Sequence, residues 1–273
     1  MLLTWLYVPG DRPDRFDKAV DSGADAIVLD LEDAVVAGRK EYARAAVADF
    51  VTQAHGLPVF VRVNELGGPE FFADIDAVGK ARGVAGLRLP KVESAAQVIR
   101  VAGLVGAQLH CLVESAIGLE MAYRIASAHP SVAGVALGEA DLRSDLGVID
   151  DEGLVWARGR IVIAARAAGL PAPPMSVYPE LSDVDGLRAS CAAGRRMGFL
   201  GRAALHPKQL PVILEGFRPS ADELERSREL LAAVAEATER ESGVSVLPDG
   251  RFADRAMIAA AQRTVHLAAR YVS

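Results

Sequence analysis

The chain has 273 residues, enough for one large domain or two ordinary ones. Its 51% hydrophobic and 24% charged residues are typical of a globular protein and exclude a disordered or collagen-like chain. The formal net charge of −6 argues against nucleic acid as a bulk electrostatic partner.

Short apolar runs alternate with longer helical patterns along most of the chain. Near-continuous apolar strands separated by helices are typical of a parallel sheet covered by helices. Eight such units predict a closed (β/α)8 TIM barrel rather than an open doubly wound sheet, and no GxGxxG or GxxxxGK motif follows any strand. The predicted strands are 3–8, 26–31, 59–63, 87–89, 109–113, 132–137, 175–178 and 201–205, and the predicted helices are 13–22, 39–55, 71–82, 94–104, 119–128, 154–168, 183–197 and 207–216.

The remainder of the chain, residues 218–273, does not follow this rhythm. Ser220 and Glu223 form an S-x-x-E capping box that opens a helix reaching to about residue 241. A turn at 247–250 separates it from a final amphipathic helix over 255–271. We therefore expect a barrel domain over 1–217 and a C-terminal lid or oligomerisation segment over 218–273.

The cysteines and the lengths of the apolar runs indicate in which cellular compartment the protein is expected. Cys111 and Cys191 form no CxxC pair, so no disulfide framework or zinc ribbon can be built from them. The first eight residues lack the features of a signal peptide, and no apolar stretch reaches the roughly 18 residues of a membrane helix. We expect a cytoplasmic protein with no membrane partner.

Charged residues cluster where the predicted strands end, which is where barrel active sites lie. Glu114 ends one predicted strand and Asp141 follows the next, so a barrel brings these carboxylates close together. Two hard oxygen ligands without a nearby His or Cys suit Mg²⁺. The alternative is one helix-capping carboxylate and one surface acid.

A second acidic cluster follows the strand 26–31. Asp30 and Glu32 share strand parity and both can point inward, whereas Asp33 points away or begins the next loop. Such a cluster must be neutralised by a cation or by hydrogen bonds, and it either holds metal-bound waters or is an acidic helix-entry loop. Arg62 shares parity with Phe60 and should point into the barrel mouth, where it can bind a carboxylate or pair with the acidic cluster.

Three further basic residues lie at the predicted mouth. Lys91 follows Pro90 and fits a Schiff base, a phosphate contact or a salt bridge; we favour structural or substrate-tail electrostatics. Arg12 and Arg15 flank the first loop and can hold an anionic cofactor, or simply form a solvated face.

At these loops the sequence resembles the citrate lyase beta-subunit-like branch of the HpcH/HpaI aldolase family. The resemblance runs through the whole chain in order. The matching stretches are LTWLYVPGDRPDR (3–15), LDLEDAV (29–35) with Lys40 and Arg44, VRVN (61–64), LPKVE (89–93), LVESAIGL (112–119), LGEADL (137–142), GFLGRAALHPKQ (198–209) and GRFAD (250–254).

The resemblance implies a barrel with a C-terminal lid, a homotrimer or larger assembly, and Mg²⁺ chemistry, with Mn²⁺ a possible substitute. The substrates it implies are acyl thioesters of CoA or acyl carrier protein. By position it implies that Glu114 and Asp141 hold the metal, that Glu32 and Asp33 support metal-bound water, and that Arg62 grips the keto-acid carboxylate. Asp254 would match an acid/base supplied by a neighbouring subunit. Two departures, Arg143 and Met175, lie near the mouth and bear on substrate choice.

The activity expected is Mg²⁺-dependent carbon–carbon cleavage of a malyl-, citramalyl- or citryl-type thioester into an acetyl thioester, such as acetyl-CoA, and a 2-keto acid. Backbone N–H groups of Gly138, Glu139 and Ala140 should help to fix the keto acid. Arg12, Arg15 and Lys91 are the candidates for binding the thioester. The alternatives are a class II pyruvate/oxaloacetate aldolase, a thioester hydrolase or malate-synthase-like enzyme, and a non-catalytic subunit that binds a CoA thioester.

Overall fold

The structure is a computed structural model that describes residues 1–239 and 253–271. The chain divides into two compact units, Leu2–Phe217 and Met1 together with Arg218–Ser273. Among the described residues, no helix is sufficiently long and apolar to cross a lipid bilayer.

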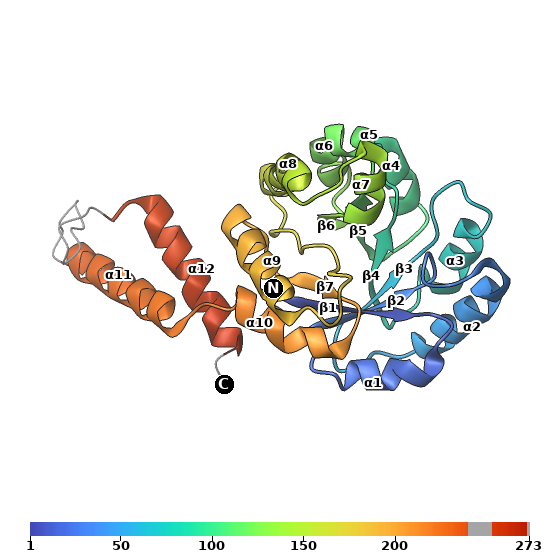
Figure 1. Cartoon of the computed structure of the whole chain (residues 1–273), viewed down its shortest axis with the longest axis horizontal. Helices are drawn as coiled ribbons and strands as arrows, with labels where there is room; N and C mark the ends of the chain where they lie inside the picture. Colours follow the sequence, from blue (N-terminus) through green and yellow to red (C-terminus); the bar gives the residue numbers. More distant parts are fainter. Residues whose placement is uncertain (240–252, 272–273) are drawn as a thin grey trace. The chain divides into compact units, whose positions relative to one another are not determined.

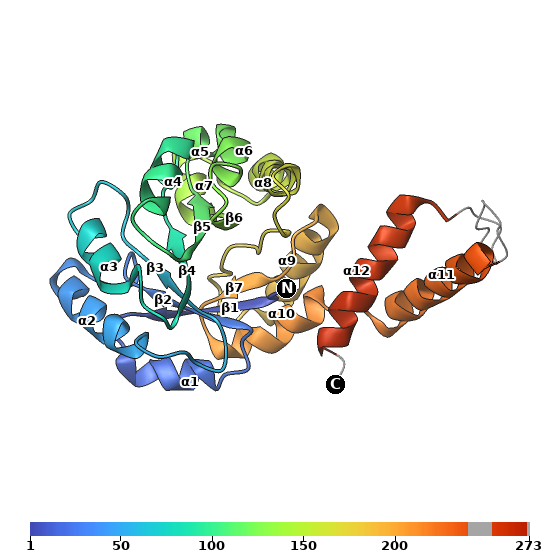
Figure 2. The same ribbon diagram turned by 180° about the vertical axis from the view of Figure 1, so that it is seen from behind.

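The first unit is built on a curled parallel sheet with helices around it (Figure 1; Figure 2 shows it from behind). The strand order is β6-β5-β4-β3-β2-β1-β7, and every pairing is parallel. The strands are β1 (Thr4–Pro9), β2 (Ala26–Asp30), β3 (Val59–Arg62), β4 (Val84–Leu89), β5 (Gln108–Val113), β6 (Val132–Leu137) and β7 (Arg202–Ala204).

Helices connect successive strands, as a parallel sheet requires. Their bounds are α1 (Phe16–Val20), α2 (Lys40–Phe50), α3 (Phe71–Val78), α4 (Ala95–Ala102), α5 (Ala116–Glu120), α6 (Ala122–Ala126), α7 (Glu139–Leu146), α8 (Val155–Ala167), α9 (Val184–Met197) and α10 (Leu210–Phe217). Short 3-10 turns are η1 (Pro13–Arg15), η2 (Ala37–Arg39), η3 (Glu152–Leu154) and η4 (Pro207–Gln209). The predicted α/β barrel class is confirmed.

The strand expected over 175–178 is the one that the structure does not form. Met175 makes only an isolated parallel bridge to Arg202, although the segment does lie between β6 and β7. Ser176 Oγ donates to the carbonyl of Leu137 at the end of β6 (2.5 Å) and accepts from the N–H of Glu139 (3.1 Å). Pro173 and Pro174 precede this segment, and proline has no N–H for a strand ladder.

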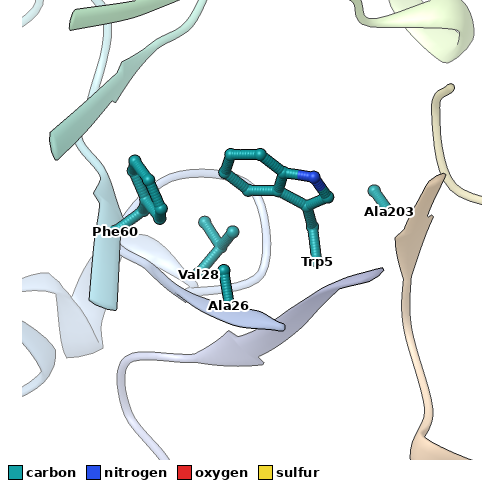
Figure 3. Packing of buried hydrophobic residues seen from close by; sticks show 5 residues of the cluster. All are labelled: Trp5, Ala26, Val28, Phe60 and Ala203. Atoms are coloured by element: carbon teal, nitrogen blue, oxygen red, sulfur yellow. The ribbon is translucent and has the colours of Figure 1, made fainter. Parts of the chain in front are cut away.

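Alternate residues of the strands point into the space that the curled sheet encloses. Trp5, Ala26, Val28, Phe60 and Ala203 form a buried cluster in which the rings of Trp5 and Phe60 lie 4.7 Å apart (Figure 3). This apolar packing fills much of the space that the strands enclose.

The second unit contains two long helices, α11 (Ala221–Glu239) and α12 (Arg255–Tyr271), which lie side by side. The expected capping box at the start of α11 is present, because Ser220 N–H donates to Glu223 Oε2 (2.8 Å) and Glu223 N–H donates to Ser220 Oγ (3.1 Å). The turn expected at 247–250 lies outside the described residues.

Candidate active site

The carboxyl ends of β2, β3 and β5 bring together buried charged residues. Asp30, Glu32 and Glu114 are each at most 5% exposed, and Arg62 is half-buried at the end of β3. Asp30 and Arg62 are direct partners in the β2–β3 register, which is why their side chains meet on the same face.

Asp30 holds Arg62 through a two-pronged ion pair. Arg62 Nε donates to Asp30 Oδ1 (2.8 Å) and Arg62 Nη2 to Asp30 Oδ2 (2.5 Å). Burial opposes the charge on Arg62, but the negative charge of Asp30 outweighs it and holds the pKa of the guanidinium above its ordinary value. Asp30 thus fixes the guanidinium plane, and the Nη1 edge is directed to Glu32 (2.7 Å).

Glu32 is a buried carboxylate between two cations. Its oxygens lie 2.7 Å from Arg62 Nη1 and 3.1 Å from Lys91 Nζ. Burial, assisted by the charges of Asp33 and Glu114, raises its pKa to about 7 against the opposing effect of Arg62. Asp33, by contrast, is mostly exposed and reaches Arg62 only at 3.5 Å, in keeping with the expectation that it points away.

Lys91 adopts a left-handed backbone conformation, with φ of 52°, which is uncommon for a residue other than glycine. In this conformation its N–H donates to Glu114 Oε2 (2.9 Å), while its ammonium pairs with Glu32. The strained turn therefore links the two carboxylates. Lys91 therefore forms contacts with the acidic cluster, and its predicted contact with a thioester stays a prediction.

Glu114 and Asp141 form the candidate metal pair. Burial raises the pKa of Glu114, and the charge of Asp141 adds to that rise, so the two carboxylates interact. A Cβ placed on Gly138 would lie 2.2 Å from Glu114 Oε1, so the carboxylate occupies space that only glycine leaves open. Asp141 lies exposed in the first turn of α7.

The donor set fits Mg²⁺. Residues 1–239 and 253–271 contain no group of three or more His, Cys, Asp or Glu side chains arranged around one point. A cation at Glu114 and Asp141 would therefore complete its coordination with water or substrate oxygens, as Mg²⁺ commonly does.

A hydrogen-bond network supports the loop that follows β2, and its residues were not among the predicted site residues. Lys40 Nζ donates to the carbonyls of Leu31 (2.7 Å) and Glu32 (2.6 Å) and to Asn64 Oδ1 (2.7 Å). Asn64 Nδ2 in turn donates to Asp74 Oδ2 (2.7 Å). These bonds fix the backbone that carries Glu32. Lys40 appears in the sequence only as part of the family pattern, and its target carbonyls become visible only in the fold.

The turn from β6 into α7 is held by a second network. Arg158 on α8 makes a two-pronged ion pair with Glu139 (2.8 and 2.7 Å). The N–H of Gly138 donates to the carbonyl of Val113 (3.0 Å), and that of Glu139 donates to Ser176 Oγ. Two of the three N–H groups predicted to fix the keto acid are thus engaged within the protein; their contact with substrate stays a prediction, as does that of Ala140.

The remaining predicted residues lie at the edge of the first unit or in the second. Arg12 pairs with Asp14 (2.8 Å), and both side chains are exposed, as is Arg15. Asp254 caps α12 by accepting the N–H of Met257 (2.7 Å). The roles predicted for Arg12, Arg15 and Asp254 stay predictions.

Comparisons with known proteins connect this geometry to a family. Residues 3–207 match the family model described as HpcH/HpaI aldolase/citrate lyase. A (3S)-malyl-CoA thioesterase from Cereibacter sphaeroides is 38% identical over 95% of this chain and 92% of its own length. A citrate lyase subunit beta from Leuconostoc mesenteroides subsp. cremoris is 33% identical over 97% and 92%.

Solved structures agree with the sequence relatives. The crystal structure of the protein CitE from Mycobacterium tuberculosis in complex with magnesium, acetoacetate and coenzyme A covers 98% of both chains, with a TM-score of 0.81 and 32% identity. A citrate lyase beta subunit from M. tuberculosis complexed with oxaloacetate and magnesium covers 79% of this chain and 96% of its own, with a TM-score of 0.69 and 33% identity.

Proposed function

Because the chain belongs to the HpcH/HpaI aldolase/citrate lyase family, a family of lyases, we propose that it is a Mg²⁺-dependent carbon–carbon lyase. Its substrate would be a 3-hydroxyacyl thioester of the malyl, citramalyl or citryl type. The products would be an acetyl thioester, such as acetyl-CoA or a close homologue, and a 2-keto acid. The observation that carries this proposal is the buried Glu114, which interacts electrostatically with Asp141 and with an arginine that Asp30 holds in a fixed plane.

In this proposal Glu114 and Asp141 hold Mg²⁺, and Mn²⁺ could replace it. When bound, the metal supplies Lewis-acid polarisation of the substrate oxygen that becomes the keto-acid carbonyl. Magnesium is present with acetoacetate and coenzyme A in the related structure from M. tuberculosis.

The side chains of this protein bind the keto acid and move two protons. Arg62 takes the carboxylate next to the hydroxyl-bearing carbon, and Asp30 holds the guanidinium in its plane. When the C2–C3 bond breaks, the 3-hydroxyl loses its proton and its carbon becomes the keto-acid carbonyl. The electron pair of the broken bond passes to the thioester enolate, which takes a proton at C2.

Two carboxyl groups are candidates for those protons. Glu32, with a pKa raised to about 7, can hold or release a proton near neutral pH and stands beside Arg62. Asp254, from a neighbouring subunit of a homotrimer, is the proposed donor to the enolate carbon, and Asp33 is proposed to support metal-bound water. The proposed contacts for CoA or acyl carrier protein are Arg12, Arg15 and Lys91. The proposed location of the protein is the cytoplasm.

Thioester hydrolysis is a second candidate function. It is favoured by one observation, namely that a relative 38% identical over 95% of this chain is named a (3S)-malyl-CoA thioesterase. In this alternative the carboxylates of the acidic cluster would activate a water for attack on the thioester carbonyl.

The decisive experiment is a mass-spectrometric screen of purified protein with Mg²⁺ against malyl-, citramalyl-, methylmalyl- and citryl-CoA. We expect an acetyl- or propionyl-CoA product together with a keto acid, and no product from Glu114→Gln. Free CoA with the intact hydroxy acid would identify a hydrolase. Thioester binding without any product would identify a non-catalytic subunit, and turnover of free aldehydes in place of thioesters would identify a class II aldolase.

A further inference from the structure

Arg88 is a buried arginine inside the sheet, next to the proposed site. It is the direct partner of Arg62 in the β3–β4 register, so both side chains leave the same face of the sheet. Arg88 is only 3% exposed, and its Nε and Nη1 atoms have no hydrogen-bond partner. The charge of Arg62 is balanced by ion pairs with Asp30 and Glu32, and Arg88 has no such ion pair among the described residues.

The groups around Arg88 are aromatic rather than acidic. Its guanidinium lies 5.3 Å from the ring centre of Trp5 and 5.8 Å from that of Tyr7. The Tyr7 ring also faces the guanidinium of Arg62, at 5.3 Å. His110, the β5 partner of Arg88, is neutral because burial and the charge of Arg88 lower its pKa to about 3.

No described carboxylate lies within ion-pair distance of Arg88, as judged over residues 1–239 and 253–271. Contacts with aromatic faces offset only part of the cost of burying a cation. They leave the N–H groups on Nε and Nη1 without acceptors, and an uncompensated buried charge with unmade hydrogen bonds is strongly unfavourable. An anion beside Arg88 would supply both the charge and the acceptors.

We propose that Arg88 is a specificity-determining residue that binds a second carboxylate of the keto acid. Arg62 binds the carboxylate adjacent to the keto group. Arg88 is its neighbour across the sheet and lies against the same Tyr7 ring, so it is placed to bind the carboxylate at the far end of the keto acid. The protein would then favour a dicarboxylic keto acid over a monocarboxylic one of the same chain. This inference rests on the proposed function and identifies one residue that determines the substrate preference.

The test compares pyruvate with oxaloacetate, which differ only by the second carboxylate. Binding of each is measured by calorimetry with Mg²⁺ for the full chain, for Arg88→Met, and for Arg88→Lys. The exposed Arg124→Met on α6 serves as a matched control for loss of one positive charge. Thermal melts establish that each variant is folded, and Arg88→Lys keeps a buried charge should the Met variant fail to fold.

We expect the unaltered protein to bind oxaloacetate at least about tenfold more tightly than pyruvate. Arg88→Met should remove that preference while leaving pyruvate affinity within about twofold, and Arg88→Lys should lie between, because it keeps the charge and loses the planar fork. Arg124→Met should behave as the unaltered protein.

Three results would overturn the inference. Equal affinity of the unaltered protein for both acids would do so without any variant, and equal weakening of both acids in Arg88→Met would reduce Arg88 to a packing role. Displacement of oxaloacetate by chloride, with no discrimination from pyruvate, would show that an inorganic anion occupies Arg88. Failure of the unaltered protein to bind either keto acid would instead refute the proposed function, and this inference with it.

Discussion

At the scale of single residues, the orientation of Arg62 depends on Asp30. We predict that Asp30→Asn weakens keto-acid binding about tenfold, because an amide cannot accept both guanidinium N–H groups. Affinity for CoA should stay within about twofold. Calorimetric titration of keto acid and of CoA separates the two. The exposed pair Asp185–Arg188 supplies the control, since Asp185→Asn should change neither affinity; unchanged keto-acid affinity in Asp30→Asn would refute the positioning role.

His110 makes stability depend on pH. Its pKa is about 3 in the folded protein, because burial against Trp5, Phe60 and Arg88 disfavours the charged ring, whereas an unfolded histidine titrates near 6.5. Between these values the unfolded chain binds a proton that the folded chain does not. Stability is therefore lost as the pH falls from about 6.5 toward 3.

We predict that His110→Gln flattens this dependence, by at most about 1.4 kcal/mol per pH unit, because a single proton separates the folded from the unfolded state. Glu32 acts in the opposite direction: its raised pKa means that the folded state binds the extra proton as the pH falls through about 7. The measurement is therefore the difference between the urea-unfolding free energies of variant and unaltered protein at pH 7, 6, 5 and 4. Parallel curves would contradict the assignment.

The same residues show what the sequence could predict about the site. Glu114 was predictable, because it directly follows an apolar strand in a barrel pattern. An ion pair of Arg62 with the acidic cluster was one of two expected roles and is present. That Asp30 is its two-pronged partner depends on the β2–β3 register, which strand parity alone does not give. Arg88 was missed for the same reason, because its position beside Arg62 depends on the β3–β4 register.

At the scale of secondary-structure elements, the turn from β6 into α7 decides whether the metal pair can form. We predict that Gly138→Ala lowers Mg²⁺ affinity at least about tenfold, because the new Cβ would lie 2.2 Å from Glu114 Oε1 and displace that carboxylate. Calorimetric Mg²⁺ titration measures the loss, and circular dichroism should show an intact fold. Unchanged Mg²⁺ affinity would place the metal away from Glu114.

A matched glycine lies in α8. A Cβ on Gly159 would meet nothing within 4 Å outside its own helix, so Gly159→Ala should leave Mg²⁺ affinity unchanged. It should also stabilise the protein by roughly 0.5–1 kcal/mol, since alanine is the better helix former. The contrast separates a steric effect at Glu114 from a general effect of replacing glycine.

Elements with strong periodicity were predicted well, and two that depend on their surroundings were not. The strand β6 has the bounds that its apolar run suggested. By contrast, α7 was not expected, because residues 139–146 carry acidic residues and little apolar periodicity, and its start is fixed by Glu139 pairing with Arg158. The segment near Met175 has the composition of a strand but forms one bridge to Arg202, and the side chain of Ser176, rather than its backbone, bonds the end of β6.

At the scale of the whole molecule, the question is how the second unit contributes to the reaction. Asp254 caps α12 in the structure, and it is also the proposed acid/base for the thioester enolate. The two roles make different demands on the side chain, because a cap needs only a hydrogen-bond acceptor whereas proton transfer needs a carboxyl group. Substitutions at this one position can therefore tell them apart.

We predict that Asp254→Ser, which retains a capping oxygen, loses most of kcat with normal binding of Mg²⁺ and keto acid, as does Asp254→Ala. A serine variant that keeps full kcat would leave Asp254 as a cap alone. Because the proposed trimer shares its sites between subunits, mixing Asp254→Ser with Glu114→Gln under conditions of subunit exchange should restore part of the activity. Some sites would then combine an intact metal pair with an intact Asp254. Exchange shown by mass spectrometry without recovery of activity would mean that each Asp254 serves its own barrel.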